Sequence, residues 1–578
     1  MSELGGHVSD YLVADLRGLG EDRLRRTQAV LTQLEREGWR QALALDGLCV
    51  LLGPRSRLKV RQVHRRHILI GDWRGRGRAL SAVIGGSRGS LDLARGVVAE
   101  GWGRYILLWI DNAGRLCLLR DPSGALDCLW WITGGARFVA RNPPQAINPL
   151  LPTDLAIDWS ALAALARSPQ LISGPLPLVG LHAVTAGDLA LVGDDEKALD
   201  VRPIWRPADF CHKGTSWDES PERLVALIDQ VVEDLVTGHE RVLCELSGGL
   251  DSSIVSSSIV ARNLVSKTSF LNFHDDRPEG DERRYALAAS AKLAVPLTTV
   301  RKPVRPITFE EMAQIAFAAR PALHGLDPVY DVDVAERART NGATGLVTGQ
   351  GGDAVFFQSP DPRVYVDRLH RRPLRWPEPG YLFDVARWTR RSAWCVASLA
   401  FEKGPSASMD CRHPWLTEME GLPPAKAAQI GHLANAGLFW GDCRRSRQAE
   451  LLHPLLSQPV MEHCLAIPTD RLTQGGRDRA LARQAFRRRL PALVVERRDK
   501  GDLSCFYGKV VRSSAPMLRD LLLTGRLCAQ GILDRDEVER GLADADLVWD
   551  AASSRFLVFA QLEAWALVWE RRIASLER

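Results

Sequence analysis

Short, mostly apolar runs separated by longer mixed segments are the main pattern in the middle of the chain. Residues Val242–Leu246 form such a run, whose length is typical of a buried strand. Residues Ser252–Val265 are mainly small or aliphatic and predict a helix. The Ser-Gly-Gly sequence at 247–249 separates them, so the pattern predicts a sharp turn from a strand into a helix. Further buried strands are expected at Phe270–Phe273 and Gly345–Thr348, with helices between them.

Alternating apolar and polar positions dominate the N-terminal part. Segments Tyr105–Ile110 and Leu116–Leu119, joined by an Asp-Asn-Ala-Gly sequence, predict a β-hairpin. Residues Pro175–Val192 predict another pair of strands, with a turn at Gly187 and Asp188.

The order of these elements predicts an α/β protein with two domains. The polar stretch Arg206–Pro221 is the best boundary, so we expect a strand-rich domain at 1–210 and a second domain at 211–578. Strands that alternate with helices in the second domain indicate a parallel sheet, whose ligands bind at the carboxyl ends of the strands. After about residue 380 the pattern is mostly helical, ending in a helix at Phe556–Ile573.

Composition and charge narrow the class of protein. The chain has 578 residues, of which 46% are hydrophobic and 25% charged, and a net charge of +5, so it has no strong electrostatic signature of a nucleic-acid partner. None of its eleven cysteines forms a C-x-x-C pair, which favours reduced thiols over a zinc site or a disulfide framework. We find no signal peptide and no run of eighteen apolar residues, so we expect a cytoplasmic protein without a membrane span.

The Ser-Gly-Gly turn is a candidate phosphate site. Glycines let backbone N–H groups approach a ligand, and the start of a helix carries partial positive charge. Hydroxyl donors are available from Ser247, Ser252 and Ser253. The turn is not a Walker loop, which needs a Lys after its last Gly, and it lacks the third Gly of G-x-G-x-x-G. An ordinary glycine turn with a serine helix cap is the alternative interpretation.

Several motifs resemble those of asparagine synthetases and their relatives. The sequence SGGLDS at 247–252 is similar to the pyrophosphate loop (PP-loop) of enzymes that cleave ATP to AMP and pyrophosphate. The sequence VTGQGGDAVF at 347–356 resembles the family's second signature, and GDERRYA at 280–286 its D-E-x-x-Y-A element. Segment 453–468 and the stretch from Gly475 to Lys500, with Arg483 and Leu490-Pro491, resemble later elements. Residues 101–131 resemble the glutaminase-type domain, which implies an N-terminal domain of the N-terminal-nucleophile (Ntn) type with αββα layers.

The resemblance implies a role for each matching residue. It makes Asp251 and Asp353 magnesium ligands, and it places Ser247, Gly248, Gly249, Ser252 and Ser253 around the pyrophosphate of ATP. It gives Leu246, Leu271, Asn272, Thr348 and Gly349 as adenosine contacts. It makes Lys500 the electrostatic catalyst, although a surface Lys beside Arg497 and Arg498 is the alternative. Asp281 and Glu282 are either close to the metal or favourable charges at a helix start.

Gln350 stands where asparagine synthetases carry Glu and β-lactam synthetases carry Tyr. A Gln side chain is not a strong base, so we expect it to orient the substrate by hydrogen bonds.

One departure from the family bears on the substrate. Glutamine-dependent synthetases need Cys directly after the initiator Met, whereas this chain has Ser2 there and its first Cys is Cys49. An amine supplied by the substrate itself is a feature of β-lactam synthetases and of lasso-peptide cyclases. The length of the chain and the departure of its N-terminal domain from the family's pattern favour a lasso-peptide cyclase. Such an enzyme would use ATP and Mg²⁺. Its expected partners are a precursor peptide, a leader-binding protein and a leader peptidase. A β-lactam-synthetase-like or ammonia-dependent asparagine-synthetase-like enzyme is the alternative.

Overall fold

The structure is a computed structural model that describes residues 6–194, 200–211, 219–275, 280–371, 379–401, 413–498, 504–543, 547–549 and 553–576. Two antiparallel six-stranded sheets form the N-terminal half. The first has the order β12-β8-β9-β1-β3-β2, with β1 (Tyr11–Asp15), β2 (Arg40–Leu45), β3 (Leu48–Leu52), β8 (Leu129–Thr133), β9 (Ala136–Ala140) and β12 (His182–Ala183). The second has the order β14-β13-β7-β6-β5-β4, with β4 (Val60–His64), β5 (His67–Gly75), β6 (Gly101–Ile110), β7 (Leu116–Arg120), β13 (Asp188–Val192) and β14 (Asp200–Pro203).

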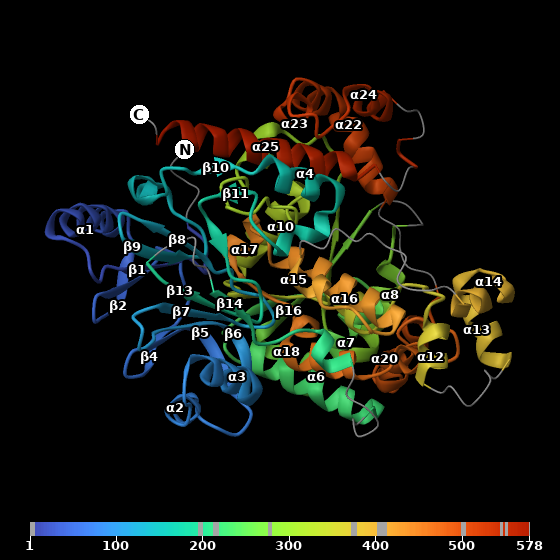
Figure 1. The fold of residues 1–578 in the computed structure, drawn as a ribbon. Coiled ribbons are helices and arrows are strands. Elements are labelled where there is room, and N and C mark those ends of the chain that lie inside the picture. Colours follow the sequence, from blue (N-terminus) through green and yellow to red (C-terminus); the bar gives the residue numbers. More distant parts are fainter. Residues whose placement is uncertain are drawn as a thin grey trace.

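The two sheets pack face to face, and helices cover their outer faces (Figure 1). Along β6, Ile106 and Leu108 lie in the core between the sheets, whereas Leu107 lies on the outer face with α3 (Ser90–Glu100). Successive residues of a strand point to opposite faces, so this alternation follows from the sequence pattern. On the far side, α1 (Glu21–Arg36) covers the outer face of β1. The expected αββα layering is therefore confirmed, as is the hairpin of β6 and β7.

The expected strand pair within residues 175–192 is wrong. Strand β12 pairs with β8 in the first sheet, while β13 pairs with β7 and β14 in the second. The turn at Gly187 carries the chain from one sheet to the other. Its φ is +81°, and a Cβ atom would lie 2.7 Å from the carbonyl oxygen of Trp205, so only glycine fits there. The next residue, Asp188, is buried in an ion pair with Arg206 at 2.5 Å.

A parallel five-stranded sheet forms the centre of the C-terminal half, as the sequence predicts. Its order is β17-β16-β15-β18-β19, with β15 (Val242–Glu245), β16 (Thr268–His274), β17 (Leu297–Arg301), β18 (Gly345–Val347) and β19 (Glu450–Leu452). The chain runs outward from β15 through β16 to β17, and then crosses to the other side of β15 to form β18. The strand order thus reverses between β15 and β18, and parallel sheets bind ligands at such a switch point.

Helices surround this sheet and extend beyond it, and the last helix runs across to the N-terminal half (Figure 1). The longer α-helices, besides α1 and α3, are α4 (Trp159–Arg167) of the N-terminal half and α6 (Pro221–Val236), α7 (Leu250–Ala261), α8 (Arg283–Leu293), α10 (Pro328–Thr340), α12 (Val364–Arg371), α13 (Pro379–Thr389), α16 (Pro424–Ala436), α18 (Gln458–Ala466), α22 (Ser504–Leu523), α24 (Arg535–Ala543) and α25 (Arg555–Ala574). The shorter α-helices are α2 (Leu80–Gly85) of the N-terminal half, α5 (Ala208–Cys211), α9 (Phe309–Ala313), α11 (Gly352–Val355), α14 (Ala393–Ser398), α15 (Pro414–Thr417), α17 (Arg444–Gln448), α19 (Thr469–Leu472), α20 (Ala480–Phe486), α21 (Ala492–Val495) and α23 (Arg526–Ala529). A small sheet of two strands is formed by β10 (Ala156–Ile157) and β11 (Leu178–Val179). The remaining described elements are the 3₁₀ helices η1 (Gln145–Leu150), η2 (Pro169–Ser173), η3 (Val265–Lys267), η4 (Leu399–Phe401), η5 (Gly437–Trp440) and η6 (Pro454–Leu456).

The last helix, α25, joins the two halves. Its Trp565 indole donates a hydrogen bond to the carbonyl of Ala318 at 2.8 Å, and Arg572 donates to the carbonyl of Pro143 at 2.9 Å. Leu12 of β1 and Trp569 of α25 belong to the same hydrophobic core. The expected boundary near residue 210 stays a prediction, since α25 packs on residues from both sides of it. No helix in the described ranges is both long and apolar enough to cross a membrane.

Candidate functional site

Two glycine-rich loops meet at the carboxyl ends of β15 and β18. A Cβ atom on Gly349 would lie 2.4 Å from the backbone nitrogen of Ser252, and one on Gly352 would lie 2.3 Å from Cγ of Asp251. Real Cβ atoms do not approach other atoms so closely, so these positions admit only glycine without movement of the backbone. The loop after β18 therefore packs directly on the first turn of α7, and the two sequence motifs form one surface.

The turn after β15 is held by its own hydroxyl groups. The Ser247 and Ser252 hydroxyls are hydrogen-bonded at 2.9 Å, and the backbone N–H of Gly249 donates to Ser247 Oγ at 3.2 Å. Gly248 has a φ of +88°, and a Cβ there would contact the backbone of α8 at 2.7 Å. Gly249 is the N-cap of α7, so the turn leads to the partially positive end of that helix.

The two predicted magnesium ligands lie together and share one guanidinium group. Arg479 Nη1 donates to Asp251 Oδ2 at 2.8 Å and to Asp353 Oδ1 at 3.1 Å. Asp251 is 13% exposed at its side chain and Asp353 47%, so the pair faces solvent through Asp353. Burial alone would lower the pKa of Arg479, but Asp251, Asp478 and Asp353 raise it, so the group stays charged.

Arg479 is a site residue that the sequence analysis did not single out. Its backbone is left-handed, with a φ of +52°, at the start of α20. Its Nε donates to Asp478 at 2.9 Å, and Asp478 in turn accepts a bond from Arg483 at 2.8 Å. The available signal was the Arg-Asp-Arg sequence inside the segment that resembles the family, although only Arg483 was given a place there.

A hydrogen-bonded chain orients the loop that carries Gln350. His453 Nε2 lies 3.2 Å from the carbonyl oxygen of Phe439, which can only accept, so this nitrogen carries the proton. His453 Nδ1 then accepts from the Thr348 hydroxyl at 2.7 Å, and Thr348 Oγ1 accepts from the backbone N–H of Gln350 at 3.1 Å. Burial lowers the pKa of His453 to about 4, which keeps the imidazole neutral and the chain of donors fixed.

The two loops open on a cavity of about 600 Å³, which also includes Gln350. Pockets for small molecules and cofactors commonly measure about 300–1,000 Å³. Other polar groups also line the cavity: Tyr330 donates a hydrogen bond to Glu245, and Lys302 pairs with Asp327 at 2.5 Å. Burial alone would lower the pKa of Lys302, but Tyr507, Asp327 and Glu245 raise it. The cavity is therefore large enough for a nucleotide. The ion pair of Lys302 and Asp327 adds fixed charges to its wall, besides those of the two loops.

The predicted site residues divide into three groups. Those that line the cavity are Ser247, Gly249, Asp251, Ser252, Leu271, Glu282, Thr348, Gly349, Gln350 and Asp353. Those buried just behind it are Leu246, Gly248, Ser253 and Asn272. The Asn272 amide donates to the carbonyl of Leu246 at 3.0 Å, and the Ser253 hydroxyl donates to that of Gly249 at 2.8 Å, so these two side chains support the backbone. Lys500 lies outside the described residues.

Asp281 and Glu282 differ in their partners. Asp281 accepts a hydrogen bond from the backbone N–H of Arg283 at 3.0 Å and from its guanidinium, at the start of α8. Glu282 lines the cavity and forms an ion pair with Arg497 at 2.6 Å. The structure thus favours a helix-start role for Asp281.

The donor set fits a magnesium ion that arrives with a nucleotide. Mg²⁺ is commonly held by one or two carboxylates together with substrate phosphates and water. Asp251 and Asp353 supply such a pair beside the loop after β15. In the described part of the chain, no group of three or more His, Cys, Asp or Glu side chains could hold a metal. These residues therefore suit an ion completed by phosphate oxygens better than an ion held by the protein alone.

Comparisons with known proteins agree with the site in the C-terminal half. Residues 223–567, more than half of the chain, match the family model described as asparagine synthase. A search of curated proteins finds no match. A solved structure described as the allosteric regulatory enzyme of purine biosynthesis is 8% identical, covering 53% of this chain and 77% of that one, with a TM-score of 0.20. The glutamine phosphoribosylpyrophosphate amidotransferase from B. subtilis, complexed with ADP and GMP, is 9% identical, covering 60% and 76%, with a TM-score of 0.19. These scores are too low to carry an argument.

Proposed function

The chain belongs to the asparagine synthase family, and from that premise we propose that it is a lasso-peptide cyclase. The family identifies it as an ATP-dependent amide-forming ligase. A lasso-peptide cyclase would activate an Asp or Glu side chain of a precursor peptide as an acyl-adenylate. The N-terminal amine of the same peptide would then attack, closing a macrolactam and releasing AMP after pyrophosphate.

The observation that carries the adenylating step is the convergence of Asp251 and Asp353 beside the glycine-rich turn after β15. A carboxylate is a poor electrophile, and its reaction with ATP brings two anionic groups together. The start of α7 and the Arg479 guanidinium supply positive charge where phosphate would lie. A magnesium ion held by the two carboxylates would neutralise charge on the leaving pyrophosphate. Lys500 is proposed to stabilise charge that develops on the acyl group.

The cysteines up to and including Cys211 are unsuited to glutaminase chemistry, which is compatible with an amine that comes from the substrate. Burial raises the pKa of Cys49 to about 11 and those of Cys117 and Cys128 to about 12. Burial also raises the pKa of Cys211. A reactive thiol needs a lowered pKa, because the thiolate is the nucleophile. These four cysteines are therefore unsuited to release ammonia from glutamine.

Gln350 is proposed to position the substrate by hydrogen bonds. Its backbone is fixed through Thr348 and His453, and its side chain lies at the cavity. A peptide α-amine titrates at about 7.7–8.0, so an appreciable fraction is neutral at pH 7 without a protein base. We expect Gln350→Ala to lower kcat by the same factor at pH 7 and pH 9. Ring closure measured at both pH values tests this, and a selective recovery of rate at pH 9 would show that Gln350 assists deprotonation.

Mass spectrometry of the product tests the proposed function. A candidate precursor peptide is incubated with the full chain, a leader-binding protein, a leader peptidase, ATP and Mg²⁺. The expected product has lost one water, resists exopeptidase digestion and appears together with AMP. Reactions without ATP, or with the Asp353→Asn enzyme, are the controls. AMP release on a small amino acid or β-amino acid, with every peptide unchanged, would instead indicate an asparagine-synthetase-like or β-lactam-synthetase-like enzyme.

A further inference from the structure

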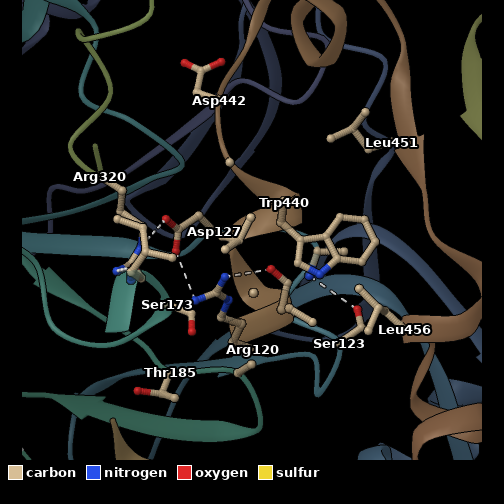
Figure 2. Close-up of a pocket in the computed structure, with 18 of the residues that line it drawn as sticks. Arg120, Ser123, Asp127, Ser173, Thr185, Arg320, Trp440, Asp442, Leu451 and Leu456 are labelled. Carbon is tan, nitrogen blue, oxygen red and sulfur yellow. Dashed lines mark hydrogen bonds and ion pairs between the residues drawn. The ribbon is translucent and has the colours of Figure 1, made fainter. Parts of the chain in front are cut away.

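A second, smaller cavity lies where the N-terminal half meets the C-terminal half. It measures about 90 Å³, and Leu323 and Leu451 contribute to its wall and to that of the 600 Å³ cavity. Its lining comes from β6 and β7, from the segments before β1 and after β9, and from C-terminal residues including Arg320 and Trp440. Figure 2 shows Arg120 and Arg320 converging on Asp127 in this cavity. We refer to it as the interdomain cavity.

Three arginines of the interdomain cavity each have one buried nitrogen without a hydrogen bond. Within the described part of the chain, Arg104 Nε, Arg141 Nη1 and Arg320 Nη2 are buried and have no hydrogen-bond partner. Arg104 is otherwise bound to Ser9 and Glu450, and Arg320 to Asp127 at 2.8 Å. Buried polar groups normally have a hydrogen-bond partner, because a buried donor without an acceptor costs free energy. The three donors belong to residues that line one cavity, so a molecule bound there could accept hydrogen bonds from them.

Arg141 is the least neutralised of the three. Its side chain is 8% exposed, and the nearest carboxylate oxygens belong to Asp10 at 3.8 Å and Asp442 at 4.0 Å. Both distances exceed a hydrogen bond. Asp442 is already paired with Arg447 at 3.1 Å. A buried guanidinium without a close carboxylate is costly, which favours an additional anion beside Arg141.

The lining of the interdomain cavity carries an excess of positive charge. The charged residues that line it are Arg104, Arg120, Arg141, Arg320, Asp127 and Asp442. Behind them lie Arg447 and the carboxylates of Glu450, Asp10 and Asp121. Burial raises the pKa values of Asp10 and Asp121 to about 6, so these two are the weakest of the anions. Burial also lowers the pKa of His413 to about 3, so this histidine adds no charge.

We propose that the interdomain cavity binds a small carboxylic acid, with its carboxylate on Arg141, Arg104 and Arg320. The lining also has apolar residues, among them Leu433, Leu438 and Trp440, which suit a short aliphatic chain better than a phosphate ion. Guanidinium groups bind carboxylates in charge-assisted hydrogen bonds that are stronger than bonds between neutral groups. The site is separate from the adenylating site, so this inference does not depend on the identity of the ligase substrate.

Calorimetric titration of the full chain with sodium butyrate tests the proposal. We expect saturable binding beyond that of sodium chloride at equal ionic strength, together with a butyrate-dependent rise in Tm. Arg141→Gln should weaken the binding by about tenfold or more, because it removes a charged hydrogen bond worth roughly 1.5 kcal/mol or more. Arg339→Gln is the control, since Arg339 lies exposed on α10 in an ion pair with Glu336.

A second variant, at another arginine of the cavity, tests the proposal independently of any effect of Arg141→Gln on folding. Arg320→Lys keeps the charge but removes Nη2, and we expect it also to weaken butyrate binding by about tenfold. Binding that is unchanged in both variants would overturn the proposal, as would equal effects of butyrate and chloride. Binding of inorganic phosphate but not of butyrate would overturn the assignment of a carboxylic acid. A heat signal lost in both cavity variants and kept in Arg339→Gln is the supporting result.

Discussion

Asp353→Asn is expected to lower the rate of magnesium-dependent conversion of ATP to AMP and pyrophosphate by about a thousandfold. The substitution keeps the shape of the side chain but removes the charge that, with Asp251, would hold the metal. Because Asp353 is the more exposed of the two carboxylates and Asn is isosteric, the fold should be retained. Pyrophosphate release under single-turnover conditions measures the chemical step directly.

The matched control for this prediction is Asp333→Asn. Asp333 lies on α10, is 36% exposed at its side chain and pairs with Arg337 at 2.6 Å, away from the cavity. Its replacement should leave turnover within about twofold of the parent, as is usual for surface positions. If Asp353→Asn turned over ATP as fast as Asp333→Asn, Asp353 would not be a metal ligand.

Arg479→Gln is expected to lower kcat/KM for ATP by about a hundredfold, since it removes a buried cation beside the proposed phosphate position. It should also change how magnesium affects stability. Without the guanidinium, the carboxylates of Asp251 and Asp353 repel each other in a partly buried place. A bound cation would relieve that repulsion, so Mg²⁺ should raise the Tm of the variant more than that of the parent. Thermal unfolding with and without Mg²⁺, in the absence of ATP, measures the difference.

Arg489→Gln separates this effect from a general loss of ion pairs. Arg489 forms a bidentate ion pair with Asp229, with N–O distances of 2.7 and 2.9 Å, and neither residue lines the cavity. Its loss should lower Tm without making the protein more responsive to Mg²⁺. An equal response of Tm to Mg²⁺ in the parent and in Arg479→Gln would argue against metal binding between the two aspartates.

Local patterns predicted the loop after β15 well, because the turn depends on neighbouring residues. The apolar run before Ser247 and the glycines at 248 and 249 specify a strand, a left-handed turn and a helix start within about ten positions. The parallel sheet followed from the same alternation of strands and helices. Arg479 could not be found this way, because it approaches Asp251 from 228 positions further along the chain.

Other features that the sequence did not reveal have the same origin. The segment around Gly187 contains two real strands, but their partners are β8 and β7, which only the packed sheets reveal. Asn272 and Ser253 carry the polar groups expected of a binding site, yet their side chains are bonded to the backbone. Sequence patterns identify which side chains are polar, whereas packing decides which way each one points.

The attachment of α25 to the N-terminal half also sets the order in which the protein can mature. Ribosomes add about 5–20 residues per second, so the first sheets emerge well before residues 555–574. Until then, β10 and α4 lack the helix that packs on them, and the carbonyl of Ala318 lacks the two tryptophans that donate to it. The apolar surface that α25 buries therefore stays exposed until the end of synthesis, which makes the incomplete chain prone to aggregation.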